Sequence, residues 1–94
     1  MVIWKYSIST NDNHNILMPT GSIPCYFNMQ NGSPCIWSII LDPAAQKIDY
    51  HFILMGTGKE YEIKEFKYIG SCKDGAFIWH LLQILIPNIY IEGT

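Results

Sequence analysis

Hydrophobic and polar positions alternate along this chain in short runs, without the longer periodicity of amphipathic helices. In residues 2–8 the large side chains of Val2, Trp4, Tyr6 and Ile8 occupy every second position, which is the period of a strand with one buried face. Similar runs, rich in β-branched and aromatic residues and bounded by turn-forming residues, cover residues 2–8, 16–18, 23–29, 35–41, 47–55, 67–72 and 76–82. The pattern predicts an all-β fold, a single small antiparallel β-sandwich or barrel of about seven strands.

Two dipeptides anchor the strand pairing. Asn31-Gly32 and Asp74-Gly75 each lie between two apolar runs. Both tolerate the positive φ angles of a type I′ turn, so we expect β-hairpins at Asn31-Gly32 and at Asp74-Gly75. Residues 61–66 (YEIKEF) alternate in charge like an edge strand but could also form a helical turn. We assign these residues neither to a strand nor to a helix.

The first hairpin also bears on the cysteines. A two-residue turn at Asn31-Gly32 places Cys25 opposite Ser38 and Cys35 opposite Asn28, with the two thiols on opposite faces of the sheet. This disfavours a local disulfide. Together with Cys72, the sequence predicts three free and mostly buried thiols in a reducing compartment.

Two of the runs, residues 35–41 and 76–82, are apolar on both faces. Such strands are covered on both sides. Charged residues make up only 15% of the chain, against about 25% in an average soluble domain. We therefore expect a homo-oligomer, a dimer or tetramer, in which one of these two strands contributes the contact.

The chain is long enough for one domain, which we place at residues 1–86, followed by a C-terminal tail at residues 87–94 that begins with Pro87. A net charge of -2 with six Lys and Arg residues argues against binding to DNA or RNA, which requires a basic surface. No apolar stretch approaches the roughly 20 residues that span a bilayer, and no signal peptide is recognisable. We expect no membrane association and a cytoplasmic protein.

A glycine pair after the fifth run is the strongest candidate for a ligand site. Gly56, Thr57, Gly58 and Lys59 combine unobstructed backbone amides, a hydroxyl and a positive charge, which can hold phosphate oxygens. The segment lacks the spacing of a Walker loop. The alternative is an ordinary turn between a strand and a loop, which is the more common role of paired glycines.

Aromatic and histidine side chains complete the candidate site. Bases stack on aromatic rings, and Tyr61 is the ring that we expect to be available, because it follows the glycines in a charged segment. His80 follows Trp79 in an apolar run, so it is either a hydrogen-bonded core histidine, which we favour, or a polar group in a subunit interface. The candidate ligand-binding residues are Gly56, Thr57, Gly58, Lys59, Tyr61 and His80.

Catalytic and metal-binding patterns are not apparent. No two of the three histidines have metal-ligand spacing, so no metal site and no cofactor are expected. Asp49 and His51 share a strand face, which we interpret as an exposed polar face. Paired carboxylates at a useful spacing and nucleophile motifs are missing, so the sequence favours a binding protein over an enzyme.

Several short motifs occur in a distinctive order. They are IWKY near the start, the MPTG step at residues 18–21, QNGSPCIWSIILDP, GTG after a strand and KYIGSCKDGAFIWH. In this order, from Ile3 to His80, they resemble a family of small phage-encoded all-β domains of unknown function. The resemblance implies a phage origin, and hence a place in the host cytoplasm.

Two functions follow from these expectations. One is a phage accessory protein acting against bacterial defence, which sequesters a small anionic ligand such as a cyclic nucleotide immune signal in pockets between subunits, without catalysis. The alternative is a protein–protein interaction module that binds a host or phage protein through its apolar strand faces. The small number of basic residues favours the alternative, because a phosphorylated ligand usually attracts Arg and Lys.

Overall fold

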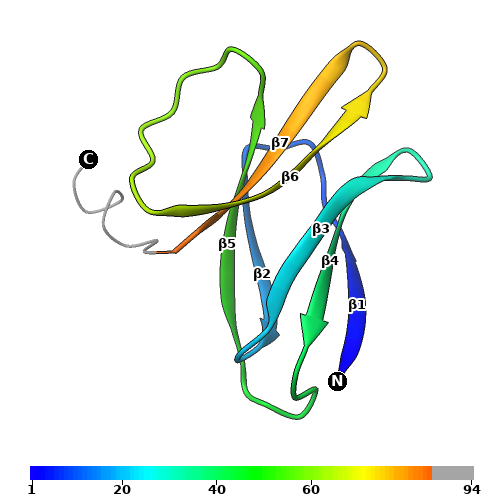
Figure 1. Ribbon diagram of the computed structural model, residues 1–94, viewed down its shortest axis with the longest axis vertical. Coiled ribbons are helices and arrows are strands. Elements are labelled where there is room, and N and C mark those ends of the chain that lie inside the picture. The colour runs from blue at the N-terminus through cyan, green and yellow to red at the C-terminus, as the bar shows by residue number, and fades with distance from the viewer. Residues whose placement is uncertain (86–94) are drawn as a thin grey trace.

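The computed structural model describes residues 1–85, and all of its regular elements are strands. The strands are β1 (Val2–Ser7), β2 (Asn13–Pro19), β3 (Ile23–Gln30), β4 (Ser33–Ile40), β5 (Lys47–Gly56), β6 (Phe66–Asp74) and β7 (Phe77–Ile84). They form two antiparallel sheets, one with the order β1-β4-β3 and one with the order β2-β5-β7-β6 (Figure 1). The predicted all-β fold is confirmed as a small β-sandwich. The expected C-terminal tail at residues 87–94 lies outside the described residues.

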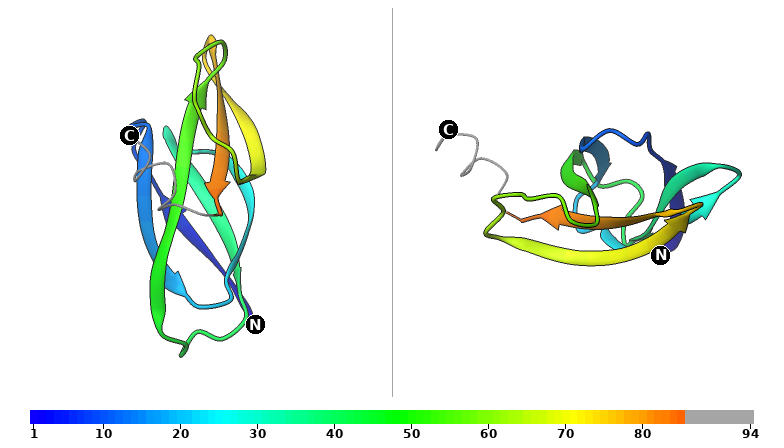
Figure 2. Two further views of the ribbon diagram at one scale, coloured as in Figure 1. Left: turned by 90° about the vertical axis from the view of Figure 1, so that its left-hand side faces the viewer. Right: turned by 90° about the horizontal axis from the view of Figure 1, so that it is seen from above.

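The core lies between the two sheets. It is formed by one apolar face of each sheet and contains Met18, Phe27, Ile36, Tyr50, Phe52, Leu54, Cys72 and Leu81. β3 and β6 come close together where the sheets meet, as the views in Figures 1 and 2 show. A Cβ on Gly70 of β6 would lie 3.7 Å from Cβ of Phe27, so glycine allows this approach.

Residues 1–85 include no helix long and apolar enough to cross a membrane.

Both predicted hairpins are present, with one difference in the turn. Asn31 and Gly32 have φ angles of 52° and 80°, as a type I′ turn requires. In the second hairpin Asp74 pairs with Phe77, so the central residues are Gly75 and Ala76. Gly75 has a φ of 60° and Ala76 is not among the residues with positive φ. A positive φ at the first central residue alone is the pattern of a type II′ turn.

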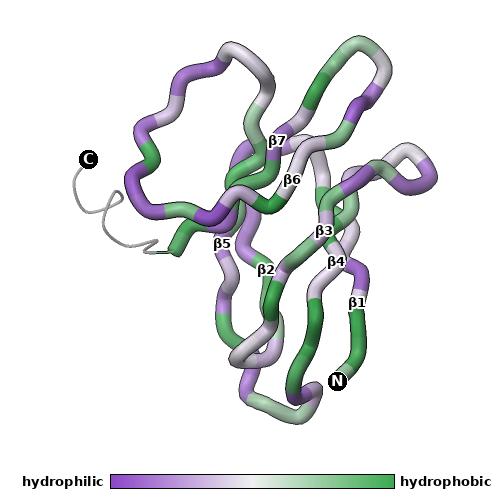
Figure 3. The backbone as a smooth tube through the Cα atoms, viewed as in Figure 1, coloured by the Kyte–Doolittle hydropathy of each residue, from purple (hydrophilic) through white to green (hydrophobic). Residues whose placement is uncertain are grey.

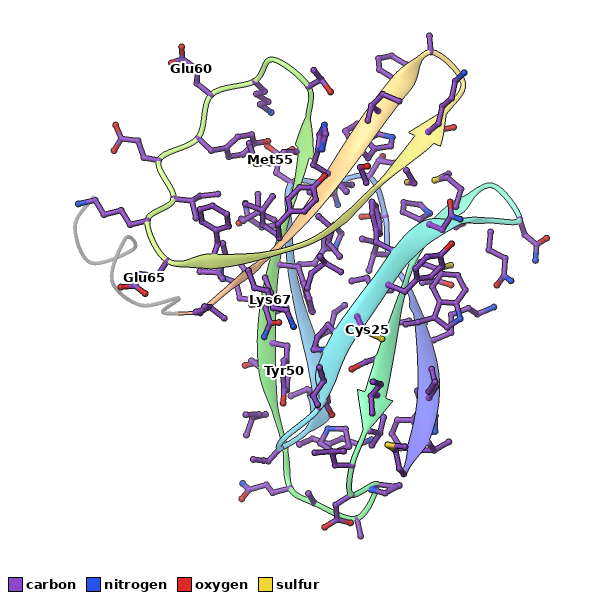
Figure 4. The ribbon with its side chains drawn as sticks, viewed as in Figure 1. Cys25, Tyr50, Met55, Glu60, Glu65 and Lys67 are labelled. Atoms are coloured by element: carbon purple, nitrogen blue, oxygen red, sulfur yellow. The ribbon has the colours of Figure 1, made fainter. Side chains whose placement is uncertain are left out.

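The cysteines are free, as predicted, but the register around Cys25 is not the expected one. Cys35 lies opposite Asn28, whereas Ser38 lies opposite Pro24, because a β-bulge shifts the register at Cys25. Pro24 directly precedes the bulge on an edge strand, where a sheet accepts proline. Cys25 is exposed on β3 (Figure 4), and Cys35 and Cys72 are buried.

Two strands extend further than their apolar pattern indicates. β2 begins at Asn13, before the predicted run at residues 16–18, because His14 and Asn15 pair with Phe52 and His51 of β5. Strands pair through backbone N–H and C=O groups, so pairing does not depend on apolar side chains. β7 likewise continues through Gln83, which pairs with Phe52 on one side and Lys67 on the other.

The two strands that are apolar on both faces lie inside their sheets. β4 lies between β1 and β3, and β7 lies between β5 and β6. Leu82 and Ile84 point away from the core cluster, yet they are buried within this single chain. The start of β7 differs, because Phe77 is 66% exposed and Ile78 39% exposed. A second subunit is therefore not needed to cover Leu82 and Ile84.

The connection between β5 and β6, residues 57–65, has no regular structure. It is mostly hydrophilic along its length, and Glu60 and Glu65 point outward from it (Figures 3 and 4). Tyr61 and Ile63 are half-buried while their neighbours in the sequence are exposed. One side of this segment therefore packs against the body of the protein.

Candidate functional site

The predicted glycine loop forms a tight turn at the end of β5. The Lys59 N–H donates to the Gly56 carbonyl at 3.3 Å, and Gly58 has a φ of 87°. Positive φ at the third residue of a four-residue turn is the pattern of type II, which favours glycine there. The amide of Lys59 is thus used within the turn, as the turn interpretation of this segment requires.

A pocket opens next to this turn because β7 is longer than β5 at this end. Gly56 opposite Trp79 is the last pair between β5 and β7, while Phe77 and Ile78 pair only with β6. The hairpin of β6 and β7 thus extends past β5, toward the top of Figure 1. The resulting pocket has a volume of about 500 Å³ and is lined by Gly56, Thr57, Lys59, Ala76, Phe77, Ile78 and Trp79.

Two aromatic rings form one wall of the pocket. The rings of Phe77 and Trp79 stack with centroids 6.0 Å apart and an angle of 23° between their planes. Trp79 Nε1 lies 3.4 Å from Asp74 Oδ2, to which it donates a long hydrogen bond. This bond fixes the half-buried indole, and the exposed Phe77 ring extends its flat surface outward. Such a surface suits a planar ligand group, because stacking on aromatic rings is insensitive to the identity of the base.

Lys59 supplies the positive charge at the rim. Its Nζ lies 3.0 Å from Asp12 Oδ2 and 5.5 Å from the centroid of the Tyr61 ring. The hydrogen bond to Asp12 raises the pKa of Lys59 above its usual value, with Tyr61 adding to the effect. Lys59 therefore remains protonated at neutral pH. Its ammonium has three N–H donors, and the ion pair with Asp12 uses one of them.

His80 lies beside the pocket rather than in the core. Its Nε2 lies 3.0 Å from Thr57 Oγ1 and its Nδ1 lies 2.9 Å from the Tyr68 hydroxyl. The ring is half-buried on the face of β7 opposite the core cluster, where it pairs with Met55 and Ser71. The favoured interpretation as a core histidine is wrong, since strand alternation places His80 on the other face from Trp79 and Leu81.

The hydrogens of this cluster have one arrangement that uses every donor. Tyr68 donates to Nδ1 of His80, Nε2–H donates to Thr57 Oγ1, and the Thr57 hydroxyl donates to the Ile78 carbonyl at 3.5 Å. The proton on Nε2 then prevents His80 from acting as a base toward Thr57. The cluster holds the turn against β7, so it positions a wall of the pocket.

The six predicted site residues are thus brought near one another, in different roles. Gly56, Thr57 and Lys59 line the pocket, Gly58 shapes the turn, and His80 holds Thr57. Tyr61 lies under Lys59 and does not line the pocket; its hydroxyl oxygen is buried and has no hydrogen-bond partner in the described part of the chain. We expected an available ring, and the structure instead gives a half-buried one.

The aromatic and apolar wall, Phe77 to Trp79, was not predicted as part of a site. The run AFIWH following the turn marks it only as a strand. What exposes it is the shorter length of β5, which depends on pairing between distant segments. The early end of the apolar run at Met55, before two glycines, is the one signal in the sequence that could have indicated it.

Asp49 and His51 do not form the expected exposed polar face. His51 is 7% exposed, and its Nε2 lies 3.2 Å from Asn13 Oδ1 of β2. Burial lowers the pKa of His51 below its usual value, and the nearby charge of His14 adds to this effect. Among residues 1–85, no three His, Cys, Asp or Glu side chains come together as metal ligands.

Comparison with known proteins identifies the family of the chain. A family model described as a domain of unknown function, DUF7352, matches residues 1–86. The chain therefore belongs to this family. No curated protein and no solved structure matches it.

Proposed function

We propose that this member of the DUF7352 family is a binding protein that sequesters a small anionic ligand carrying an aromatic base, without converting it. The observation that carries the proposal is the pocket in which the stacked rings of Phe77 and Trp79 adjoin the ammonium of Lys59. In the most specific form of the proposal, the ligand is a cyclic nucleotide signal.

The size and lining of the pocket fit such a ligand. Pockets for small molecules have volumes of roughly 300 to 1,000 Å³ and are mostly apolar with a few polar groups; this one has about 500 Å³. The base would stack on the exposed face of Phe77, and a phosphate would approach Lys59. Lys59 is the one charged residue in the lining, so we expect stacking to supply most of the affinity and phosphate contacts to remain partly hydrated.

Sequestration requires that the ligand is bound and that it is not converted. The polar side chains near the pocket fit this requirement, because they are already hydrogen-bonded to one another. Thr57, His80 and Tyr68 satisfy one another by hydrogen bonds. The resemblance of the sequence to small phage-encoded domains supports an accessory role against bacterial defence, in the cytoplasm of the host cell. A cyclic nucleotide immune signal is a ligand whose removal would serve a phage.

A thermal-shift screen tests this proposal. The panel contains cyclic dinucleotides, cyclic trinucleotides and ADP-ribose derivatives. A ligand at a hundredfold excess over its dissociation constant should stabilise the fold by about 2.7 kcal/mol. The same screen on Phe77→Ala should give a smaller shift, because one stacked ring is lost. Phe77 is 66% exposed, so its truncation does not open the core. A panel that leaves the melting temperature of the wild-type protein unchanged would refute the proposal.

A second candidate function rests on the outer face of the sheet formed by β1, β4 and β3. Lys5 is the single charged residue in these three strands, and Ile3 and Tyr26 are 59% and 52% exposed on this face. Apolar surface of this kind marks protein interaction sites. The alternative function is an interaction module for a host or phage protein. This alternative predicts that Tyr26→Lys, and not Phe77→Ala, abolishes binding to the host or phage protein.

A further inference from the structure

We infer that β1 is a site of self-association, at which two copies of the chain pair their β1 strands antiparallel and join their three-stranded sheets. The ligand pocket plays no part in this contact, so the inference is independent of the proposed function. Its basis is the open backbone edge of β1, together with the protection of the other edge strands.

The direction of the backbone groups in β1 follows from one hydrogen bond. The Ile8 N–H donates to the Pro34 carbonyl of β4 at 2.9 Å. Backbone groups of successive residues in a strand point alternately to opposite sides. Val2, Trp4 and Tyr6 therefore direct their N–H and C=O groups toward β4, while those of Ile3, Lys5 and Ser7 point away from it. β1 pairs with β4 alone, so these outward groups form an open edge.

Proteins usually protect such edges with prolines, bulges or charges, and the other three edge strands have these devices. β3 contains Pro24 and a bulge and lies against β6. β6 has its own bulge before Gly70, and Lys67 and Lys73 among its residues. β2 is polar in its first half and ends at Pro19.

β1 has none of these protections except one lysine. Its register with β4 continues without interruption from Val2 to Ser7, and it contains no proline. An unprotected, regular and apolar edge is a template for another strand. The β1 strand of a second copy can be this partner, because antiparallel pairing of two identical strands about a two-fold axis is self-complementary.

The position of Lys5 disfavours one register, and we place the contact in the neighbouring register toward the start of β1. Outward-pointing residues must lie opposite each other to exchange hydrogen bonds. Placing Lys5 opposite Lys5 would oppose two like charges, which is destabilising. Shifting by one pair places Ile3 of one copy opposite Lys5 of the other and brings the two Trp4 side chains together at the axis. In this register each copy donates the amides of Ile3 and Lys5 to the other.

The contact also fits the composition of the sheet. Joining two copies extends the outer face that carries Ile3 and Tyr26 across the two-fold axis, and the Nζ of each Lys5 keeps its bond to Gln30 Oε1 within its own copy. A contact along one strand is smaller than a standard interface of about 800 Å² per partner. We therefore expect an association of micromolar order that reverses on dilution.

Proline at position 5 tests the edge directly. Lys5→Pro removes an outward-pointing N–H and leaves the bonds to β4 intact, and edge strands tolerate proline in this orientation. Lys5→Ala is the matched control, because it removes the same side chain and its bond to Gln30 but keeps the N–H. Sedimentation velocity at high micromolar concentration should give twice the chain mass of 10.8 kDa for the wild type and for Lys5→Ala, and a monomer for Lys5→Pro.

Two further measurements keep the inference falsifiable. Hydrogen exchange of the wild type, resolved by residue, should show Ile3 and Lys5 amides protected at high concentration and unprotected on dilution; this does not depend on the folding of any variant. Tyr26→Lys places a charge on the outer face away from the edge and should still dimerise. A monomeric wild type would overturn the inference, as would a Lys5→Pro dimer or dimerisation lost in Tyr26→Lys with Ile3 and Lys5 exchanging freely.

Discussion

Gly56 lies opposite Trp79 as the last pair between β5 and β7, and a Cβ at Gly56 would lie 3.8 Å from the indole ring. That distance is an ordinary van der Waals contact, and the φ of Gly56 is not positive. We predict that Gly56→Ala leaves stability unchanged or raises it by about 0.5–1 kcal/mol, because glycine weakens a strand. Urea unfolding measures this, and a loss above that range would show that the strand end is strained.

Gly58 is predicted to behave in the opposite way. Nothing lies within 4 Å of a Cβ there, but its φ of 87° is costly for other residues. Gly58→Val should lower the free energy of unfolding by about 1–2 kcal/mol and displace Thr57 and Lys59 from the pocket. Gly58→Asn is the control, since asparagine tolerates positive φ. Equal stability of the two variants would contradict the assigned turn.

The bond between Thr57 and His80 should be measurable as a coupling energy. Thr57→Val removes the hydroxyl and should cost about 0.5–1 kcal/mol, as expected for a neutral hydrogen bond. Thr57→Ser keeps the hydroxyl and should cost less. If the loss of this hydrogen bond causes the destabilisation, Thr57→Val should change the free energy of unfolding little further in a His80→Ala background. Additive losses in the double variant would show that the two side chains act independently.

Stability should fall on acidification partly through His51. Burial lowers the pKa of His51 in the folded protein below the ordinary value of 6.5, and His14 contributes. The unfolded chain then takes up the proton first, so the contribution of His51 is complete above pH 6.5 and is lost as the pH falls below it. Urea unfolding at pH 7.5 and pH 5.5 should show a smaller decrease for His51→Gln than for the wild type. An equal decrease would exclude His51 as a source.

The three thiols should differ in reactivity. Cys25 is exposed at the bulge of β3, whereas Cys35 and Cys72 are buried, and burial raises the pKa of Cys72, with Asp74 adding to this effect. A disulfide reagent such as DTNB should modify one thiol of the folded protein rapidly and the others only on unfolding. Cys25→Ser should remove the rapid phase. A rapid phase that persists in this variant would show that a second thiol is accessible.

Local sequence signals predicted the local features of this fold. Asn31-Gly32 fixed its hairpin because its two residues adopt the positive φ angles that the turn needs. The prediction that Cys25 faces Ser38 failed, because it assumed an uninterrupted register, whereas β3 has a bulge between Pro24 and Tyr26. The polar start of β2 was missed because its pairing with β5 depends on a strand more than thirty residues away.

The candidate site shows the same division. Gly56, Thr57 and Lys59 were identified from composition and do line a pocket. The wall of Phe77 and Trp79 depends on where β5 stops relative to β7, and the end of the apolar run at Met55 is the one local signal of that position. His80 was assigned to the core because its neighbours are apolar, yet strand alternation places it on the opposite face, beside Thr57.

Calorimetric titration of three proteins with the ligand found by the screen tests the proposed function most directly. The proteins are the wild type, Phe77→Ala in the pocket, and Tyr26→Ala, which truncates an aromatic of similar exposure (52%) on the other sheet. Loss of one stacked ring, about 1–3 kcal/mol, predicts an affinity reduced roughly 5- to 150-fold for Phe77→Ala and unchanged for Tyr26→Ala. Unchanged binding by Phe77→Ala, or an equal loss in both variants, would contradict binding in this pocket.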